Sequence, residues 1–194
     1  MSADIQQSLP ALDPALAWLI AIALAMLLLA SALHKLRDLP GFEAVLGNYD
    51  ILPARAAHLV PVVARIAVAL ELLLAVALLV PGAAGWAGPA TALLLGLYAL
   101  AIGINLMRGR RDIDCGCLGP GAGAGARNGL SPWLVARNLV LMSLAAAHAL
   151  PVAQRSLHWL DAITALGALL VLAGLWQATH LLIAHDTFQQ ERFS

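Results

Sequence analysis

Long apolar runs separated by short polar stretches make up most of the chain. A transmembrane helix needs about 20 mostly apolar residues to cross the hydrocarbon core of a bilayer. Five stretches meet this requirement, at residues 14–34, 59–80, 88–107, 132–150 and 159–184. The pattern therefore predicts an all-α fold, a polytopic membrane helix bundle with about five transmembrane helices in residues 14–184, between an N-terminal tail (1–13) and a C-terminal tail (185–194).

The first apolar run invites comparison with a signal peptide, because Ala30-Ser31-Ala32 resembles a small-residue cleavage site. The segment before it carries Asp4 and Asp13 but neither Lys nor Arg. A signal peptide has a basic segment at that place. We therefore expect a retained helix.

Composition places the chain in a bilayer. Hydrophobic residues make up 61% and charged residues 11%, and the mean hydropathy is +0.85, whereas soluble domains are roughly 25% charged. The formal net charge is zero, so there is no overall positive field to attract nucleic acid. Membrane lipid is the expected surrounding, and no nucleic-acid partner is predicted.

Positive charge is concentrated in two of the four predicted loops. Basic loops tend to stay in the cytoplasm, so this pattern places the N-terminus outside and the first and third loops inside. The rule fails for arginines that bind something. The residues concerned are Lys35, Arg37 and Arg55 in or beside the first loop, and Arg108, Arg110, Arg111 and Arg127 in the third.

The third apolar run has two distinct faces. One is a stripe of small residues at helical spacing, which predicts close helix packing. The other carries Tyr98 and Asn105, which either line a polar path toward the third loop or satisfy neighbouring backbone groups. The stripe consists of Ala92, Gly96, Ala99 and Gly103.

Glu71 lies near the middle of the second apolar run. An ionised carboxylate at that depth costs about 2.5–3.5 kcal/mol on insertion scales. The sequence offers two readings: an ion pair or hydrogen bond with Arg137 or Asn138 of the fourth run, or a neutral Glu71 that donates one hydrogen bond between helices.

Both cysteines of the chain, Cys115 and Cys117, lie in the third loop with Gly116 between them. Two residues so close can form only a strained disulfide, and a strained disulfide is more easily reduced than a structural one. Thiolate is the reactive form, and three preceding arginines favour it while two aspartates oppose it. These are Arg108, Arg110 and Arg111, against Asp112 and Asp114.

Other uses of the cysteines fit less well. Inert apolar cysteines belong in a span, whereas these lie in a polar loop. Zinc needs four ligands, and Asp112 and Asp114 would complete only a poor site, so no metal is predicted. The run "GPGAGAGARNG" that follows imitates a nucleotide-binding loop, but no strand precedes it; we interpret it as a flexible linker.

Beside Glu71, three blocks of the chain form a recognisable pattern: "ASALHKLRDLPGFEAVLGNYDILP", "NLMRGRRDIDCGCLGP" and "ARNLVLMSL". Together they resemble one known family, the MauE methylamine utilisation proteins within the DoxX-like membrane group. The resemblance runs from about residue 26 to 145, and its most specific part is the CGC block.

The resemblance implies a multi-pass protein of the cell inner membrane that matures the small, disulfide-rich subunit of methylamine dehydrogenase. It also implies a thioredoxin-like partner, MauD. Matched to this sequence, the family's pattern gives Cys115 and Cys117 as a redox pair. It gives Lys35, Arg37, Glu71 and Arg137 as structural or relay positions. No bound cofactor is implied, and a quinone stays open.

Three functions follow from these observations. The first is a thiol–disulfide exchange component that uses Cys115 and Cys117, supported by Arg108, Arg110, Arg111, Asp114 and Gly116. The second is a non-enzymatic assembly or export factor whose CGC loop docks the client. The third, least favoured, is a small-solute transporter with Glu71 as a proton site.

Overall fold

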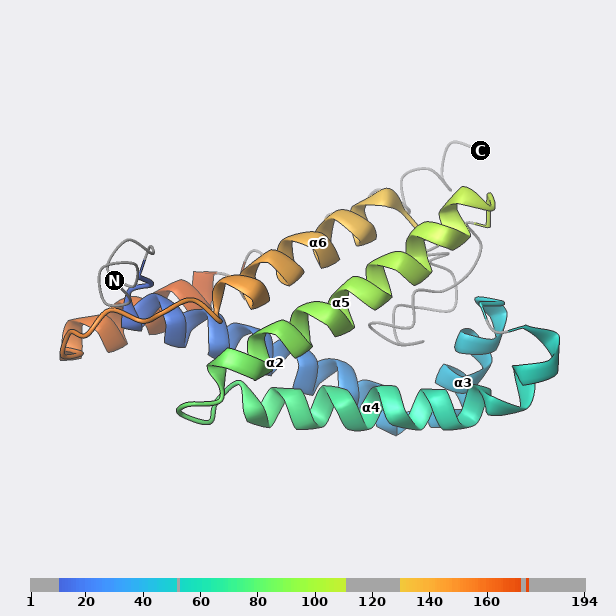
Figure 1. Ribbon diagram of the computed structural model, residues 1–194, viewed down its shortest axis with the longest axis horizontal. Coiled ribbons are helices and arrows are strands. Elements are labelled where there is room, and N and C mark those ends of the chain that lie inside the picture. Colours follow the sequence, from blue (N-terminus) through green and yellow to red (C-terminus); the bar gives the residue numbers. More distant parts are fainter. Residues whose placement is uncertain (1–10, 52, 111–129, 172–173, 175–194) are drawn as a thin grey trace, which may run out of the picture.

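The computed structural model describes residues 11–51, 53–110, 130–171 and 174 (Figure 1). The all-α fold class is confirmed, because the described residues contain helices and a single isolated β-bridge between Leu12 and Val152. The elements are α2 (Pro14–Arg37), α3 (Leu39–Asn48), the 3₁₀ helix η1 (Ala54–Leu59), α4 (Val60–Ala77), α5 (Ala84–Met107) and α6 (Pro132–Ala147).

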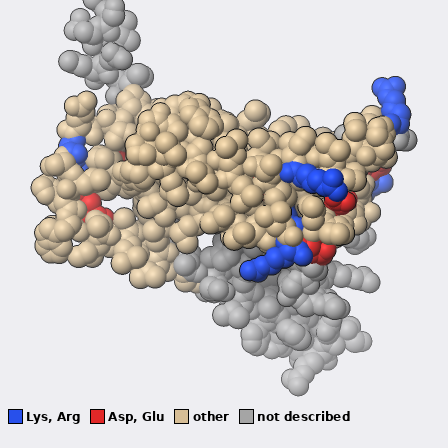
Figure 2. All heavy atoms as spheres, turned by 90° about the horizontal axis from the view of Figure 1, so that it is seen from below, with Lys and Arg blue, Asp and Glu red and all other residues tan. Residues whose placement is uncertain are grey.

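Three helical stretches are long and apolar enough to cross a membrane: Pro14–Arg37, Arg55–Ala77 and Ala84–Met107. Two more apolar helices, Pro132–Ala147 and Trp159–Val171, are shorter. Figure 2 shows charged side chains toward the two ends of the molecule and an uncharged stretch between them. Large apolar side chains such as Leu93 and Val76 are exposed. This distribution suits a bundle surrounded by lipid.

Local sequence signals explain where the helices begin. Asp13 caps α2, since its carboxylate accepts a hydrogen bond from the Ala15 amide at 2.8 Å, and Pro14 occupies the first turn. Asp38 separates α2 from α3 and caps the latter, accepting from the Gly41 amide at 3.0 Å. Both are favoured N-cap residues, and proline suits the first helical position.

The main core lies between α2, α4 and α5, with α6 packed along α5 (Figure 1). Leu24 and Leu28 of α2 are almost fully buried and belong to one cluster with Leu74 of α4 and Leu95 of α5. The first helix is therefore a central part of the bundle.

Glycines bring α5 and α6 close together. A Cβ atom added at Gly88 would lie 2.7 Å from the Ala145 carbonyl oxygen, and one at Gly96 would lie 3.2 Å from the Met142 sulfur. A Cβ at Gly103 would meet nothing within 4 Å. The expected small-residue stripe thus has a close contact at Gly96 but none at Gly103, and the tightest approach is at Gly88, outside the stripe.

Replacing Gly88 with Ala is expected to destabilise the bundle by about 1–3 kcal/mol, as overpacking does in other well-packed interiors. The obstacle is backbone of α6, which cannot move aside as a flexible side chain can. Thermal unfolding of the purified protein in detergent measures the effect.

Gly85→Ala is the matched control, because a Cβ atom at Gly85 of the same helix meets nothing within 4 Å. Alanine is the better helix former by up to about 1 kcal/mol, so this variant should be neutral or slightly stabilised. Equal unfolding temperatures for the two variants would contradict the close approach at Gly88.

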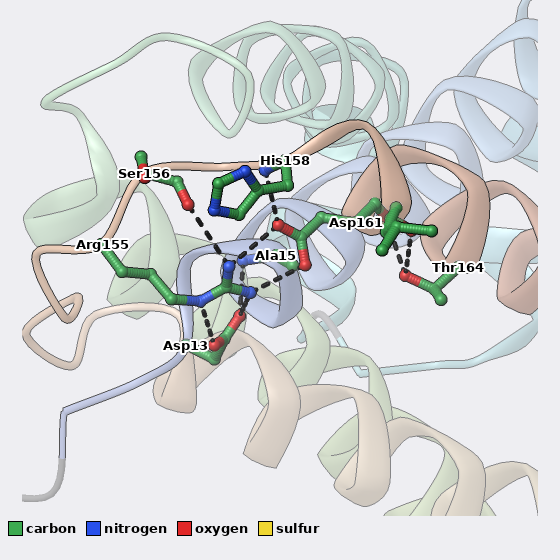
Figure 3. Close-up of polar contacts among 8 residues, drawn as sticks. Asp13, Ala15, Arg155, Ser156, His158, Asp161 and Thr164 are labelled. Atoms are coloured by element: carbon green, nitrogen blue, oxygen red, sulfur yellow. Dashed lines mark hydrogen bonds and ion pairs between the residues drawn. The ribbon is translucent and has the colours of Figure 1, made fainter.

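Arg155 joins three segments at the end of the bundle where α2 begins (Figure 3). Its guanidinium donates to Asp13 at 2.7 and 2.9 Å and to Asp161 at 2.8 and 2.9 Å. The hydrogen bonds from Arg155 hold the pKa of Asp13 below its usual range. Beside them, Leu12 exchanges two backbone hydrogen bonds of 2.8 Å with Pro151 and Ala153. The start of α2 is thereby fixed to the chain that follows α6.

Candidate functional site

A buried polar cluster lies inside the helix bundle. We call it the Glu71 cluster: Ser31 and Lys35 of α2, Glu71 of α4 and Tyr98 of α5. The Lys35 ammonium and the Glu71 carboxylate form an ion pair, with side chains 3% and 0% exposed. Buried ionic groups of this kind inside a membrane domain mark functional sites more often than surface charges do.

Three hydrogen bonds of the cluster converge on one oxygen of Glu71. The Oε1 atom accepts from the Tyr98 hydroxyl at 2.7 Å and from the Ser31 hydroxyl at 3.2 Å, in addition to Lys35 Nζ. Among the described residues, no donor reaches the Oε2 atom, which is also buried. The carboxylate is therefore satisfied on one side only.

Lys35 connects four helices. Its Nζ lies 4.9 Å from the centroid of the Phe42 ring in α3 and 4.8 Å from that of Tyr98 in α5. Both distances suit cation–π attraction. Lys35 Nζ also lies 3.5 Å from the Tyr98 hydroxyl oxygen. The ammonium of α2 thus contacts α3, α4 and α5 at one point.

The partner of Glu71 differs from the expected one. Glu71 pairs with Lys35 of α2 rather than with Arg137 or Asn138 of α6. The reason is the packing order: α4 lies against α2, whereas α6 lies mainly against α5. The Asn138 amide instead donates to the Leu134 carbonyl of its own helix at 2.9 Å.

The sequence contains a pattern that could have identified Lys35 as a buried partner of Glu71. The apolar pattern ends the first span at residue 34 and leaves Lys35 in a loop, whereas α2 continues to Arg37. Ser31 and Lys35 are four residues apart and so share one face of the helix. A lysine near a helix end can bury its aliphatic stem, and here the ammonium is buried as well. Arg37, the last residue of α2, is exposed.

Asn105 is fully buried on α5, two turns beyond Tyr98. Its amide nitrogen donates to the Ala101 carbonyl at 3.1 Å, which is the backbone role considered above. Its Oδ1 atom has no donor among the described residues. The side chain is therefore half satisfied, like Glu71.

Two arginines that precede the cysteines dock the first loop. Arg108 donates to the Asp50 carbonyl at 3.0 Å, and Arg110 donates to the Asn48 carbonyl and the Asp50 carboxylate, each at 3.4 Å. Asp50 has a φ of 49°, a conformation that Asp adopts more readily than most residues. The first and third loops thus meet at one end of the bundle (Figure 1).

A small apolar cluster, which we call the Tyr49 cluster, lies at this end of the bundle. It joins Tyr49 of the first loop, Ile102 of α5 and Leu130, which closely precedes α6. Arg110 and Leu130, the described residues on either side of positions 111–129, are both associated with the first loop.

Several predicted site residues lie outside the described residues, namely Arg111, Asp114, Cys115, Gly116 and Cys117. Their roles as a redox pair and its supporting groups stay predictions. Within the described part of the chain, no group of three or more His, Cys, Asp or Glu side chains is placed to hold a metal ion.

Comparison with known proteins gives consistent matches. The family model "Methylamine utilisation protein MauE" matches residues 13–151. The chain is 41% identical over 140 residues to a methylamine utilization protein MauE of Paracoccus denitrificans, covering 70% of this chain and 69% of that protein. It is 36% identical over 171 residues to the MauE of Methylophilus methylotrophus, covering 88% and 87%.

A third relative, the MauE of Methylorubrum extorquens, is 36% identical over 143 residues, or 73% of each chain. No solved structure matches. The matched residues run from the cap of α2 to just beyond the end of α6, so they include the Glu71 cluster and both cysteines. Hence the chain belongs to the MauE family of methylamine utilisation proteins.

Proposed function

We propose that this protein of methylamine utilisation acts in the inner membrane, in the maturation of the methylamine dehydrogenase small subunit, by thiol–disulfide exchange through Cys115 and Cys117. The observation that carries the proposal is the family match over residues 13–151, which contains the only two cysteines of the chain. Maturation here covers processing, transport and disulfide formation.

The exchange reaction needs only two thiols and a partner. The thiolate of one cysteine attacks a disulfide of a thioredoxin-like, MauD-type protein and forms a mixed disulfide. The second cysteine then displaces the partner, so the Cys115–Cys117 pair is oxidised as the partner's disulfide is reduced to two thiols. The reverse sequence oxidises the partner by the same steps.

The geometry around the cysteine-bearing segment supports this use. The Asp50 contacts of Arg108 and Arg110 hold the chain just before it, and the Tyr49 cluster holds Leu130 just after it. The described residues on either side of this segment, Arg110 and Leu130, therefore both contact the first loop or residues packed with it.

The contacts with Asp50 also bear on which side of the membrane this end of the bundle faces. Because Arg108 and Arg110 bind the first loop, their positive charge gives little information about membrane orientation. Arg37 and Arg55 lie at the same end, and both are exposed. The basic-loop rule places this end in the cytoplasm, whereas disulfides of an exported client form outside it. The proposal therefore keeps two orientations: the cysteine loop faces the outside, or electrons cross the membrane to an external partner.

Single substitutions should trap the exchange intermediate. In Cys117→Ser, a mixed disulfide formed by Cys115 cannot be displaced by the second thiol, so a covalent complex with a thioredoxin-like protein should accumulate. Non-reducing electrophoresis of alkylated membranes, followed by mass spectrometry of the shifted band, identifies the partner.

The Cys115→Ser variant tests which thiol attacks first, and the double variant is the control, because it can form no mixed disulfide. A shifted band in the double variant, or no band in either single variant, would count against exchange at this pair.

A further inference from the structure

The one-sided environment of Glu71 needs a physical explanation. Three donors reach Oε1, yet none of the described residues reaches Oε2, although the side chain is 0% exposed. Leaving a buried acceptor unsatisfied is costly, and more so when the group is charged. Buried polar atoms that lack a protein partner are commonly satisfied by ordered water.

Of the other buried polar atoms with this feature, two lie on the Tyr98 face of α5. They are Thr91 Oγ1 and Asn105 Oδ1, which have no partner among the described residues. Both side chains are 0% exposed. Thr91, Tyr98 and Asn105 are spaced by seven residues, which is close to two helical turns, or about 10 Å for each step. Tyr98 links this face to Glu71 through its hydroxyl.

Of the three residues on this polar face, Asn105 lies nearest the first-loop end of the bundle. It is the third residue from the end of α5, which finishes at Met107, and Arg108 follows with its bond to Asp50. An Asn side chain offers an acceptor for water while its amide stays bonded to the Ala101 carbonyl. The described residues thus supply polar atoms between the loop end and the centre of the bundle.

We propose that Glu71 is a proton-binding site in the membrane interior, reached through ordered water from the first-loop end of the bundle past Asn105. The proton binds to Oε2 and converts the carboxylate to a carboxylic acid, while Oε1 keeps its bonds to Ser31, Lys35 and Tyr98. The proton leaves by the same route, and no electrons are transferred.

Among the described residues, the titratable side chains that face Glu71 are Lys35 from α2 and Tyr98 from α5. Ser31 from α2 adds a hydroxyl, and α3 contributes the Phe42 ring beside Lys35. Two aromatic rings as well as the carboxylate stabilise the ammonium, so part of its stabilisation remains when Glu71 is neutral. This site requires no cysteine and stands apart from the exchange reaction.

Infrared spectroscopy of the full-length protein in lipid films tests the proposal. The unmodified protein and the Glu71→Gln variant are compared as the pH is stepped from acid to alkaline values. Because the other carboxyl groups of the chain are common to both proteins, the difference between their spectra should contain the carbonyl band of one protonated carboxylic acid at low pH and lose it at high pH. Because Glu71→Gln alone leaves Lys35 without its carboxylate, Lys35→Met combined with Glu71→Gln repeats the assignment with neither charge present.

Two asparagine variants test the route. Asn105→Leu should slow the response of the band to a pH step by about tenfold, an effect equivalent to about 1.4 kcal/mol in the barrier. Asn138→Leu is the matched control, because Asn138 is also buried and also donates to the carbonyl four residues earlier. Its response should equal that of the unmodified protein.

Each other outcome overturns the proposal. A difference spectrum that lacks the carbonyl band at every pH, or one in which the band does not change with pH, removes Glu71 as the proton-binding site. Equal response rates for Asn105→Leu and Asn138→Leu remove the route past Asn105.

Discussion

Replacing Lys35 with Met is expected to remove most of the folded protein from the membrane. The change leaves the Glu71 carboxylate fully buried without its cation. Breaking a buried ion pair by removing one partner costs about 3–5 kcal/mol in soluble proteins. Domains are stable by only about 5–15 kcal/mol in total. Size-exclusion chromatography of a fluorescent fusion in a detergent extract measures the loss, as the amount of monodisperse protein that remains.

A second change should recover part of that loss. In Lys35→Met with Glu71→Gln, no charge is buried, and the new amide oxygen can still accept from Ser31 and Tyr98. Arg37→Met is the control for charge at the same helix end, because Arg37 is exposed. If Lys35→Met were as abundant as Arg37→Met, the Lys35–Glu71 pair would not be a main support of the bundle.

The helices could be predicted from the sequence because hydropathy and length are enough to identify a membrane helix. Their ends were harder to place. Gly88-Pro89 suggested a third span that starts at residue 88, but α5 begins at Ala84 and includes Pro89. Pro89 is the sixth residue of α5, beyond the first turn, so it removes one intrahelical hydrogen bond; neighbouring groups commonly compensate for such a loss in membrane helices.

The contacts between helices could not be predicted from apolar periodicity. In a membrane, the face toward lipid and the face toward the core are both apolar, so the pattern does not show which side points inward. The polar residues were the only guide. Glu71 was correctly identified as buried and in need of a partner, but the choice of helix required the three-dimensional packing that brings Lys35 beside it.

The contacts of two arginines could not be predicted from the sequence either. Arg108 and Arg110 stand a few residues before Cys115, and their electrostatic effect on the thiols stays a prediction. In the structure both bind the first loop through Asp50. Asp50 and Arg110 are 60 residues apart along the chain, and no local sequence pattern connects positions at that separation.

Replacing both Cys115 and Cys117 with Ser is expected to abolish maturation of the methylamine dehydrogenase small subunit. A hydroxyl has nearly the shape of a thiol but cannot form or exchange a disulfide, so the reaction would lose both of its reacting atoms. The activity of the dehydrogenase and the free-thiol content of its small subunit, measured in cells that carry the variant, report the loss.

This result would be specific to the chemistry if the variant protein itself remains abundant. The described core of α2, α4, α5 and α6 contains neither cysteine, so the double variant should unfold at the temperature of the unmodified protein, unlike Lys35→Met. Normal maturation in the double variant would exclude the exchange mechanism and leave docking of the client as the role of the loop. Loss of maturation with unchanged stability would instead indicate that the two thiols serve the reaction and that the Glu71 cluster serves the fold.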